Sequence, residues 1–150
     1  MANPDSVGQF YLDSFGNALL ARVEATQFNT AANAAITIPI LNGGMTNSGA
    51  AGTSGQVIIR RVTVMGPTGS LSTANVSITT SNDGNISNVV CANATLSSIT
   101  SNVTFQDLSI TGTNLCLAGS NSSALFVNVN VASGNSNTAS IRVYGDVVKF

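Results

Sequence analysis

Apolar and polar residues alternate along most of the chain from residue 36 onward. The run "ALFVNVNV" (124–131) is the clearest example, because every second position is apolar: Leu125, Val127, Val129 and Val131. A period of two is typical of a β-strand with one buried face. A second alternating run, "SIRVYGDVV" (140–148), follows the polar stretch "ASGNSNTA". This order predicts two core strands that pair as a hairpin across that stretch.

Two runs change their apolar parity part-way along. In "QVIIRRVTVMG" (56–66), Val57 and Ile59 share one parity and Val62 and Val64 share the other. The switch predicts a β-bulge at Arg60–Arg61, since one extra residue exchanges the faces of a strand. The run "NVTFQDLSIT" (102–111) shows the same change, with Val103 and Phe105 before it and Leu108 and Ile110 after it. A second bulge is therefore expected near Asp107.

About eight such strands follow one another at intervals of roughly 8–12 residues, separated by Gly- and Asn-rich turns. The chain of 150 residues fits one domain. The pattern predicts an all-β fold: a single jelly-roll-like antiparallel β-sandwich over 36–150. Pro39 indicates an edge strand or a strand end, because proline cannot donate a ladder hydrogen bond. Residues 1–35 are expected to form an N-terminal arm that contains either a short helix or the first strand.

The amino-acid composition says more about the partners of the protein than about its fold. Charged residues make up 7% of the chain and the net charge is −1, whereas Asn, Ser and Thr supply about a third of all residues. Five Lys and Arg residues without a basic cluster argue against nucleic-acid binding. No apolar run approaches the roughly 20 residues that span a bilayer. We therefore expect neither a nucleic acid nor a membrane as partner.

Groups that could carry out catalysis are scarce. The chain has no histidine, which is the most frequent general base and metal ligand. Six carboxylates are scattered without a recognisable pair; Glu24 and Asp107 meet only the formal requirement of a glycosidase. Cys91 and Cys116 have apolar flanks that favour two buried thiols, with a disulfide as the alternative. The sequence predicts no enzyme, no cofactor, no metal site and no small-molecule substrate.

Two groups of residues are candidates for a protein–protein interface. Phe10, Tyr11 and Phe15 form an aromatic cluster in the arm, which must be buried under the sandwich or on a partner. Arg60 and Arg61 would lie at the predicted bulge. Arginine is enriched where protein surfaces meet, although the pair would also be satisfied by solvent or by a carboxylate such as Asp107.

Three stretches resemble the small jelly-roll cement (decoration) proteins that sit on the outside of tailed-phage heads: "IPILNGG", "VIIRRVTVMGPTGSLSTANVSITTSNDGN" and "TASIRVYGDVV". The resemblance spans most of 36–148 and transfers no site residue. It implies a structural virion protein on the outer capsid surface, present as a homotrimer that clamps neighbouring subunits of the major capsid protein. The alternative is a carbohydrate- or receptor-binding head of a phage fibre or adhesin. Sugar-binding surfaces usually stack the sugar on exposed Trp or Tyr, and this chain counts against that reading because it has no Trp and only two Tyr.

Overall fold

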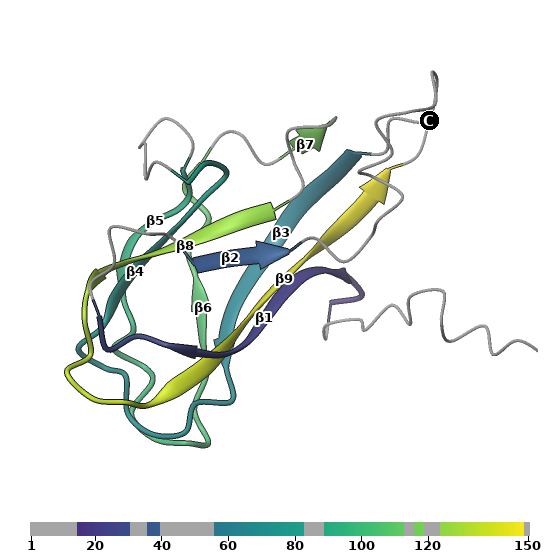
Figure 1. The fold of residues 1–150 in the computed structure, drawn as a ribbon. Coiled ribbons are helices and arrows are strands. Elements are labelled where there is room, and N and C mark those ends of the chain that lie inside the picture. Colours follow the sequence, from purple (N-terminus) through teal and green to yellow (C-terminus); the bar gives the residue numbers. More distant parts are fainter. Residues whose placement is uncertain are drawn as a thin grey trace, which may run out of the picture.

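The computed structural model describes residues 15–30, 36–39, 56–82, 89–112, 116–118 and 124–148, which form β-strands and no helix (Figure 1). The strands are β1 (Ala18–Gln27), β2 (Ile36–Pro39), β3 (Gln56–Met65), β4 (Asn75–Thr79), β5 (Val89–Thr95), β6 (Gln106–Leu108), β7 (Cys116–Ala118), β8 (Ala124–Val131) and β9 (Thr138–Val148). The all-β class expected from the alternating pattern is confirmed.

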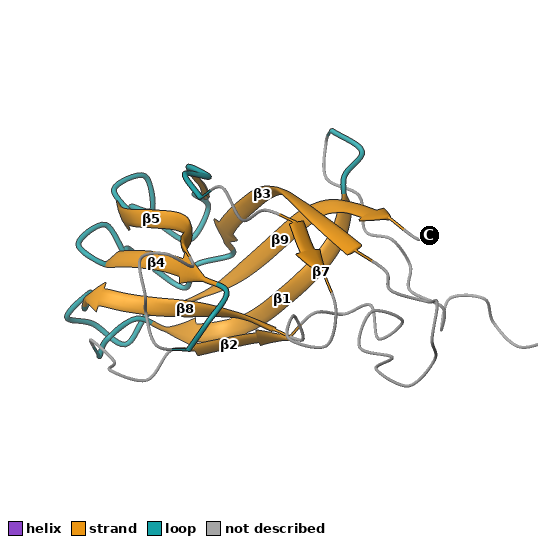
Figure 2. Ribbon diagram, turned by 90° about the horizontal axis from the view of Figure 1, so that it is seen from above, coloured by secondary structure: helices purple, strands orange, loops and turns teal. Residues whose placement is uncertain are grey.

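The strands form two antiparallel sheets that pack as a sandwich (Figure 2). One sheet has the order β1-β9-β3-β6, with the short β7 also paired to β3. The other has the order β2-β8-β4-β5. If β7 is set aside, the pairs are nested along the chain: β1 with β9, β2 with β8, β3 with β6, and β4 with β5.

The core lies between the two sheets and is built by the alternating positions. From β3, Ile59, Val62 and Val64 point inward, while Val76 and Ile78 of β4 face them from the other sheet; all five are at most 1% exposed. Burying an apolar side chain of this size contributes roughly 1.5–3 kcal/mol. The parity predicted for β4 and for most of β3 and β8 is therefore correct. Val131 at the end of β8 is the exception, with 51% of its surface exposed.

The predicted bulge in β3 is present. Ile59 pairs with Gly145 and Arg61 pairs with Tyr144, which leaves Arg60 as the extra residue. The shift allows Ile59 and Val62 both to face the core although they are three residues apart. As a result, the two consecutive arginines lie on the outer face of the five-stranded sheet.

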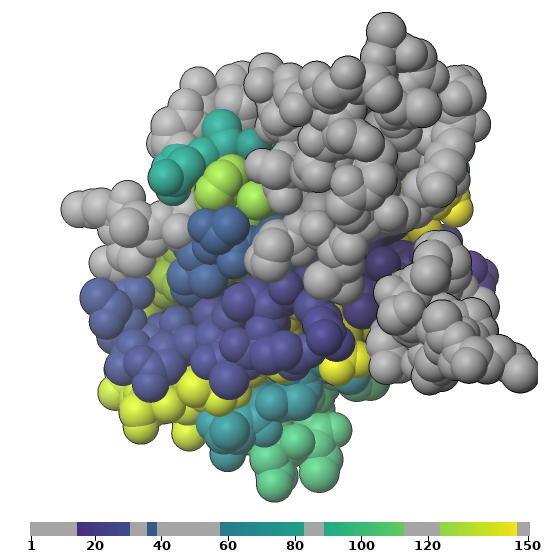
Figure 3. All heavy atoms as spheres, turned by 45° about the vertical axis from the view of Figure 1, so that its right-hand side comes forward, coloured from purple at the N-terminus to yellow at the C-terminus, as the bar shows by residue number. Residues whose placement is uncertain are grey.

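The first strand lies inside the segment that the sequence assigns to the arm. Residues 18–27 form β1, which pairs along its length with β9, so the sandwich begins at Ala18 rather than at Ile36. Among the two forms left open for this segment, the strand is the one found. β1 and β2 are the end strands of their sheets and contact each other; Figure 3 shows them side by side, β1 in purple and β2 in blue.

The predicted hairpin between the last two strands is wrong. β8 pairs with β2 and β4, whereas β9 lies between β1 and β3 in the other sheet. The connecting residues cross from one layer to the other. Asn135 and Asn137 each donate a side-chain hydrogen bond of 3.0 Å to the carbonyl of Ser70, which fixes this crossing.

The strand expected around Phe105 is shorter than predicted. β6 begins at Gln106, and its pairing with β3 runs without a shift through Asp107, so the second bulge is not formed. Val103 and Phe105 lie in the preceding loop and are exposed. Alternation alone cannot separate a strand from a loop that happens to carry two apolar residues.

Both edge strands on one side of the sandwich are interrupted. β2 has only four residues and ends at Pro39, which confirms the edge position expected for that proline. β1 has an irregularity between Val23 and Thr26, where Ala25 adopts a left-handed conformation with φ of 51°. Short and bulged edges discourage pairing with another chain, which is how this protein protects them without lysine.

Candidate contact surface on the five-stranded sheet

Among the described residues, charged side chains lie on only one of the two sheets. Within the described ranges, every charged residue lies on a strand of the five-stranded sheet: Arg22, Glu24, Arg60, Arg61, Asp107, Arg142 and Asp146. The strands of the four-stranded sheet carry none. The two outer faces therefore differ in chemistry and are suited to different neighbours.

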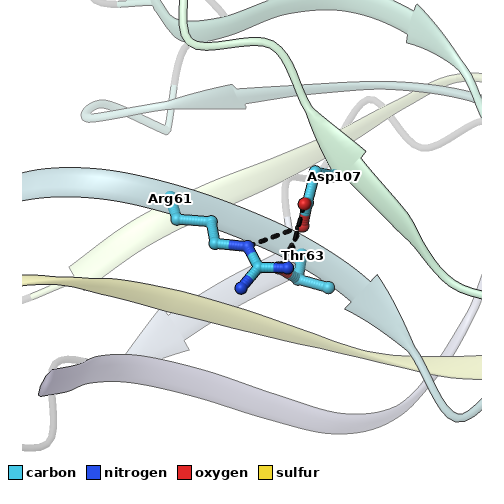
Figure 4. A network of polar contacts seen from close by, with 3 residues as sticks. All are labelled: Arg61, Thr63 and Asp107. Atoms are coloured by element: carbon cyan, nitrogen blue, oxygen red, sulfur yellow. Dashed lines mark hydrogen bonds and ion pairs between the residues drawn. The ribbon is translucent and has the colours of Figure 1, made fainter. Parts of the chain in front are cut away.

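Arg61 is the centre of a polar network on this face (Figure 4). Its Nε and one terminal nitrogen each donate a hydrogen bond of 2.9 Å to the two carboxylate oxygens of Asp107 on β6. The hydroxyl of Thr63, which is nearly buried, donates to the same carboxylate. Two-point pairing of this kind is among the stronger charge-assisted contacts. The expectation that a carboxylate such as Asp107 satisfies the arginine pair is confirmed for Arg61.

Arg60 makes a separate and more exposed ion pair. Its Nε lies 2.9 Å from Asp146 on β9, and about half of each side chain is exposed. A third group contains Glu24, which lies 3.9 Å from Arg22 and 3.6 Å from Arg142 and also accepts a hydrogen bond from Ser140. The face thus carries charges of both signs in near balance.

Phe15 lies over the same arginine. Gly16 has a φ of 83°, which only glycine adopts readily, and the turn there carries the chain back from β1 onto the outer face of the sheet. The guanidinium carbon of Arg61 is 5.3 Å from the centre of the Phe15 ring, within the range of a cation–π contact. The ring remains 77% exposed.

The structure thus brings together three of the five interface residues predicted from the sequence: Phe15, Arg60 and Arg61. Phe10 and Tyr11 lie outside the described residues. Leu108 and Ile110 line the same hollow as these three, which has a volume of about 380 Å³.

Sequence reasoning missed a second part of this surface. Val103 is 84% exposed and Phe105 is 59% exposed, and both line a hollow of about 350 Å³ on the other side of Arg61. A signal was present: the surrounding stretch "SSITSNVT" (97–104) is rich in Ser, Thr and Asn, a composition typical of loops. The alternation of Val103 and Phe105 concealed it.

The outer face of the four-stranded sheet carries amides and hydroxyls that bond to one another. Asn128 donates to the Thr79 hydroxyl at 3.0 Å. Asn130 donates to Asn93 at 2.6 Å and to Ser77 at 3.2 Å. These cross-strand contacts replace the Lys–Glu pairs that many sheets carry, and they explain how strands with so little charge remain solvated.

Few groups in the described residues could perform chemistry. Cys91 is a free thiol in the core, and burial raises its pKa to about 12, so it is a poor nucleophile. Of the carboxylates considered for a glycosidase pair, Asp107 is bound to Arg61 and Glu24 lies beside Arg142. Across the described ranges, no three His, Cys, Asp or Glu side chains gather as metal ligands. The same residues include no helix long and apolar enough to cross a membrane.

In comparisons with known proteins, no family model, curated protein or solved structure matches the chain.

Proposed function

We propose that this chain is a structural virion protein that binds the outside of an assembled phage capsid. It would clamp neighbouring subunits of the major capsid protein as a homotrimer, without catalysis and without contact to nucleic acid or membrane. A protein that binds only the assembled shell stabilises that shell by mass action. Several weak contacts from one trimer add strongly, because each raises the effective concentration of the next.

The strand order supports the jelly-roll topology that the resemblance implies. In a jelly roll, a long antiparallel ribbon is wound so that the first strand pairs with the last and the innermost two strands form a hairpin. The nested pairs β1·β9, β2·β8, β3·β6 and β4·β5 follow this order once β7 is omitted. Viral capsid proteins and lectins are the main groups that use this fold.

The observation that carries the proposal is the surface formed by Phe15, Arg60 and Arg61. An aromatic ring and two arginines are gathered at a hollow that also contains Leu108 and Ile110, on the five-stranded sheet. Aromatic residues and arginine dominate the binding energy of protein interfaces. Nothing in the ion pairs around them resembles a reaction centre, since each arginine is held by a carboxylate.

The direct test uses empty heads from a phage in which this gene is deleted. Purified protein should co-sediment with these heads and raise the temperature at which they open. Phe15→Ser combined with Arg60→Ala removes two exposed side chains and should weaken binding at least tenfold, which corresponds to about 1.4 kcal/mol. Val131→Ser, which changes an exposed apolar residue on the other sheet, is the matched control. Equal binding by all three proteins would contradict the assignment of this surface.

One observation favours the alternative, a carbohydrate-binding head of a fibre or adhesin. The outer face of the four-stranded sheet carries an uncharged row of amides: Asn128 and Asn130 donate to hydroxyls, and Asn130 also donates to Asn93. Neutral sugars are bound through such groups. A glycan array decides between the two functions: micromolar binding lost in Asn130→Ala would support the head domain, and an array without signal would remove it.

A further inference from the structure

The loop before β6 is held by its own side chains. The Thr104 hydroxyl accepts hydrogen bonds from the backbone nitrogens of Thr100 and Ser101, at 3.1 and 3.2 Å, and donates to the Ser101 carbonyl at 2.8 Å. Gln106 accepts from the nitrogen of Ser98 at 2.9 Å and donates to the carbonyl of Thr95 at 2.8 Å. These contacts fix the loop in one conformation without any apolar packing by its tip.

The fixed loop displays two apolar side chains to solvent. Val103 and Phe105 are more than half exposed, whereas Ile99, the other apolar residue of this loop, is fully buried. A loop that is ordered in advance loses little conformational entropy when it binds. Exposed apolar side chains on a rigid element mark a contact surface more strongly than the same residues in a flexible segment would.

The hollow of about 350 Å³ lies against this loop. Its other wall is formed by Arg61, Met65, Gly66 and Tyr144 of the five-stranded sheet. Apolar surface predominates in its lining, and the size suits one or two inserted side chains of the Val or Phe class. A protruding apolar group and a cavity that could receive one therefore occur next to each other on a single copy.

The charges at this place restrict the partner. Arg61 lines the hollow, and its charge is neutralised by the ion pair with Asp107, which lines the other hollow beside Phe15. A strongly charged partner of either sign would therefore gain little here, whereas an uncharged and partly apolar surface would fit. A second copy of the same chain offers such a surface in its own Val103 and Phe105, which are exposed beside the hollow on every copy. Such self-complementarity is what contacts between identical subunits require.

We propose that the 97–105 loop and the adjoining hollow form the contact between copies of this chain. Each copy inserts Val103 and Phe105 into the hollow beside Met65 and Tyr144 of its neighbour. This inference concerns the isolated protein and goes beyond shell binding. It names a surface different from the Phe15–Arg60 side of Arg61, so each of the two assignments can fail while the other stands.

The first experiment measures the mass of the isolated protein by sedimentation and light scattering over roughly 1–200 µM, the range in which interfaces of moderate affinity form. The wild-type chain should assemble into two or three copies, and the measured mass of the assembly shows which of these numbers is correct. Val103→Ser and Phe105→Ser should each raise the dissociation constant at least tenfold, whereas Val131→Ser should leave it unchanged. Circular dichroism and the unfolding temperature establish that each variant is folded; Val103→Ser changes the most exposed of these side chains.

The second experiment tests proximity without removing the contact. Val103→Cys in a Cys116→Ser background gives one reactive thiol, because Cys91 is buried and has a raised pKa. A short bis-maleimide should join two copies through position 103 at high yield, and the corresponding Val131→Cys protein should remain single. A wild-type protein that is monomeric throughout the concentration range, or an assembly that Val103→Ser and Phe105→Ser leave intact, would overturn the proposal.

Discussion

Arg61 of β3 and Asp107 of β6 face each other with two parallel hydrogen bonds of 2.9 Å across the edge of the five-stranded sheet. β6 has only three residues, so this side-chain contact supplements a short backbone ladder. The pair is partly shielded, because only 19% of the Arg61 side chain is exposed. It also receives the hydroxyl of Thr63.

Removing the carboxylate should therefore destabilise the fold more than an ordinary surface change. We expect Asp107→Ala to lower the free energy of unfolding by about 1–2 kcal/mol, since Thr63 loses its acceptor and Arg61 its partner. Urea unfolding measures the change. The Arg61–Asp107 double-mutant cycle should give a coupling of about 1 kcal/mol.

Arg60→Ala provides the control for that prediction. Arg60 and Asp146 are each about half exposed, and exposed pairs contribute about 0–0.5 kcal/mol. A loss from Arg60→Ala as large as that from Asp107→Ala would show that shielding is not the reason for the difference.

Gly145, the glycine of β9, should not tolerate a side chain. An added Cβ would lie 1.9 Å from the carbonyl oxygen of Ile58 and 2.8 Å from Leu20, so the β3–β9 ladder would have to move apart. We expect Gly145→Ala to cost at least about 3 kcal/mol. Gly134 has a φ of 74° but an open surrounding, and Gly134→Ala should cost about 1 kcal/mol. Thermal unfolding of both variants checks the order.

The Cys91 thiol should be unreactive while the protein is folded. Its pKa is raised by burial from 9.0 to about 12. The neutral thiol is therefore favoured by the fold; the stability that it contributes is complete below pH 9 and is lost as the pH rises toward 12. In a Cys116→Ser protein, a thiol reagent at pH 8 should label nothing until denaturant is added. Cys91→Ala should flatten the fall in stability above pH 9 relative to Cys116→Ser alone.

Two phenylalanines on either side of β1 should behave in opposite ways. Phe28 is fully buried, and its carbonyl is fixed by a hydrogen bond of 2.7 Å from the Ser133 nitrogen. Phe28→Ala should cost about 3–5 kcal/mol through the cavity it leaves. Phe15→Ala should change stability by no more than about 0.5 kcal/mol, because its ring is mostly exposed. A large loss from Phe15→Ala would mean that the ring stabilises the fold and is not kept for a partner.

The sequence predicted local features of this fold better than distant ones. The bulge at Arg60 was predictable, because a change of apolar parity within one strand is visible in the chain itself. The edge position of Pro39 followed from the chemistry of one residue. The partner of β8 was not predictable in this way: proximity in sequence favoured β9, whereas the two-layer packing gives β8 to β2 and β4.

The candidate site likewise contains residues that the sequence could identify and residues that it could not. Arg60 and Arg61 could be singled out because they interrupt an apolar run in a chain with few charges. Val103 and Phe105 could not, because the same alternation describes a strand and a loop held by Thr104. The strand and the loop are distinguished only by the pairing of β6 with β3, which begins at Gln106 and so leaves Val103 and Phe105 in the loop. The prediction of an interface through Phe10 and Tyr11 remains open to experiment, since both lie outside the described residues.

The nested order of the strands has a consequence for how the protein is made. β9 occupies the middle of the five-stranded sheet, between β1 and β3, and it is the last of these strands to be synthesised. Until it leaves the ribosome, β1 and β3 have no shared neighbour and their apolar faces stay uncovered. The five-stranded sheet is therefore completed only once β9 is available, through contacts distant in sequence, and such topologies fold in milliseconds to seconds rather than in microseconds. During that interval the uncovered apolar faces of β1 and β3 are open to aggregation, which the finished sandwich prevents by burying them.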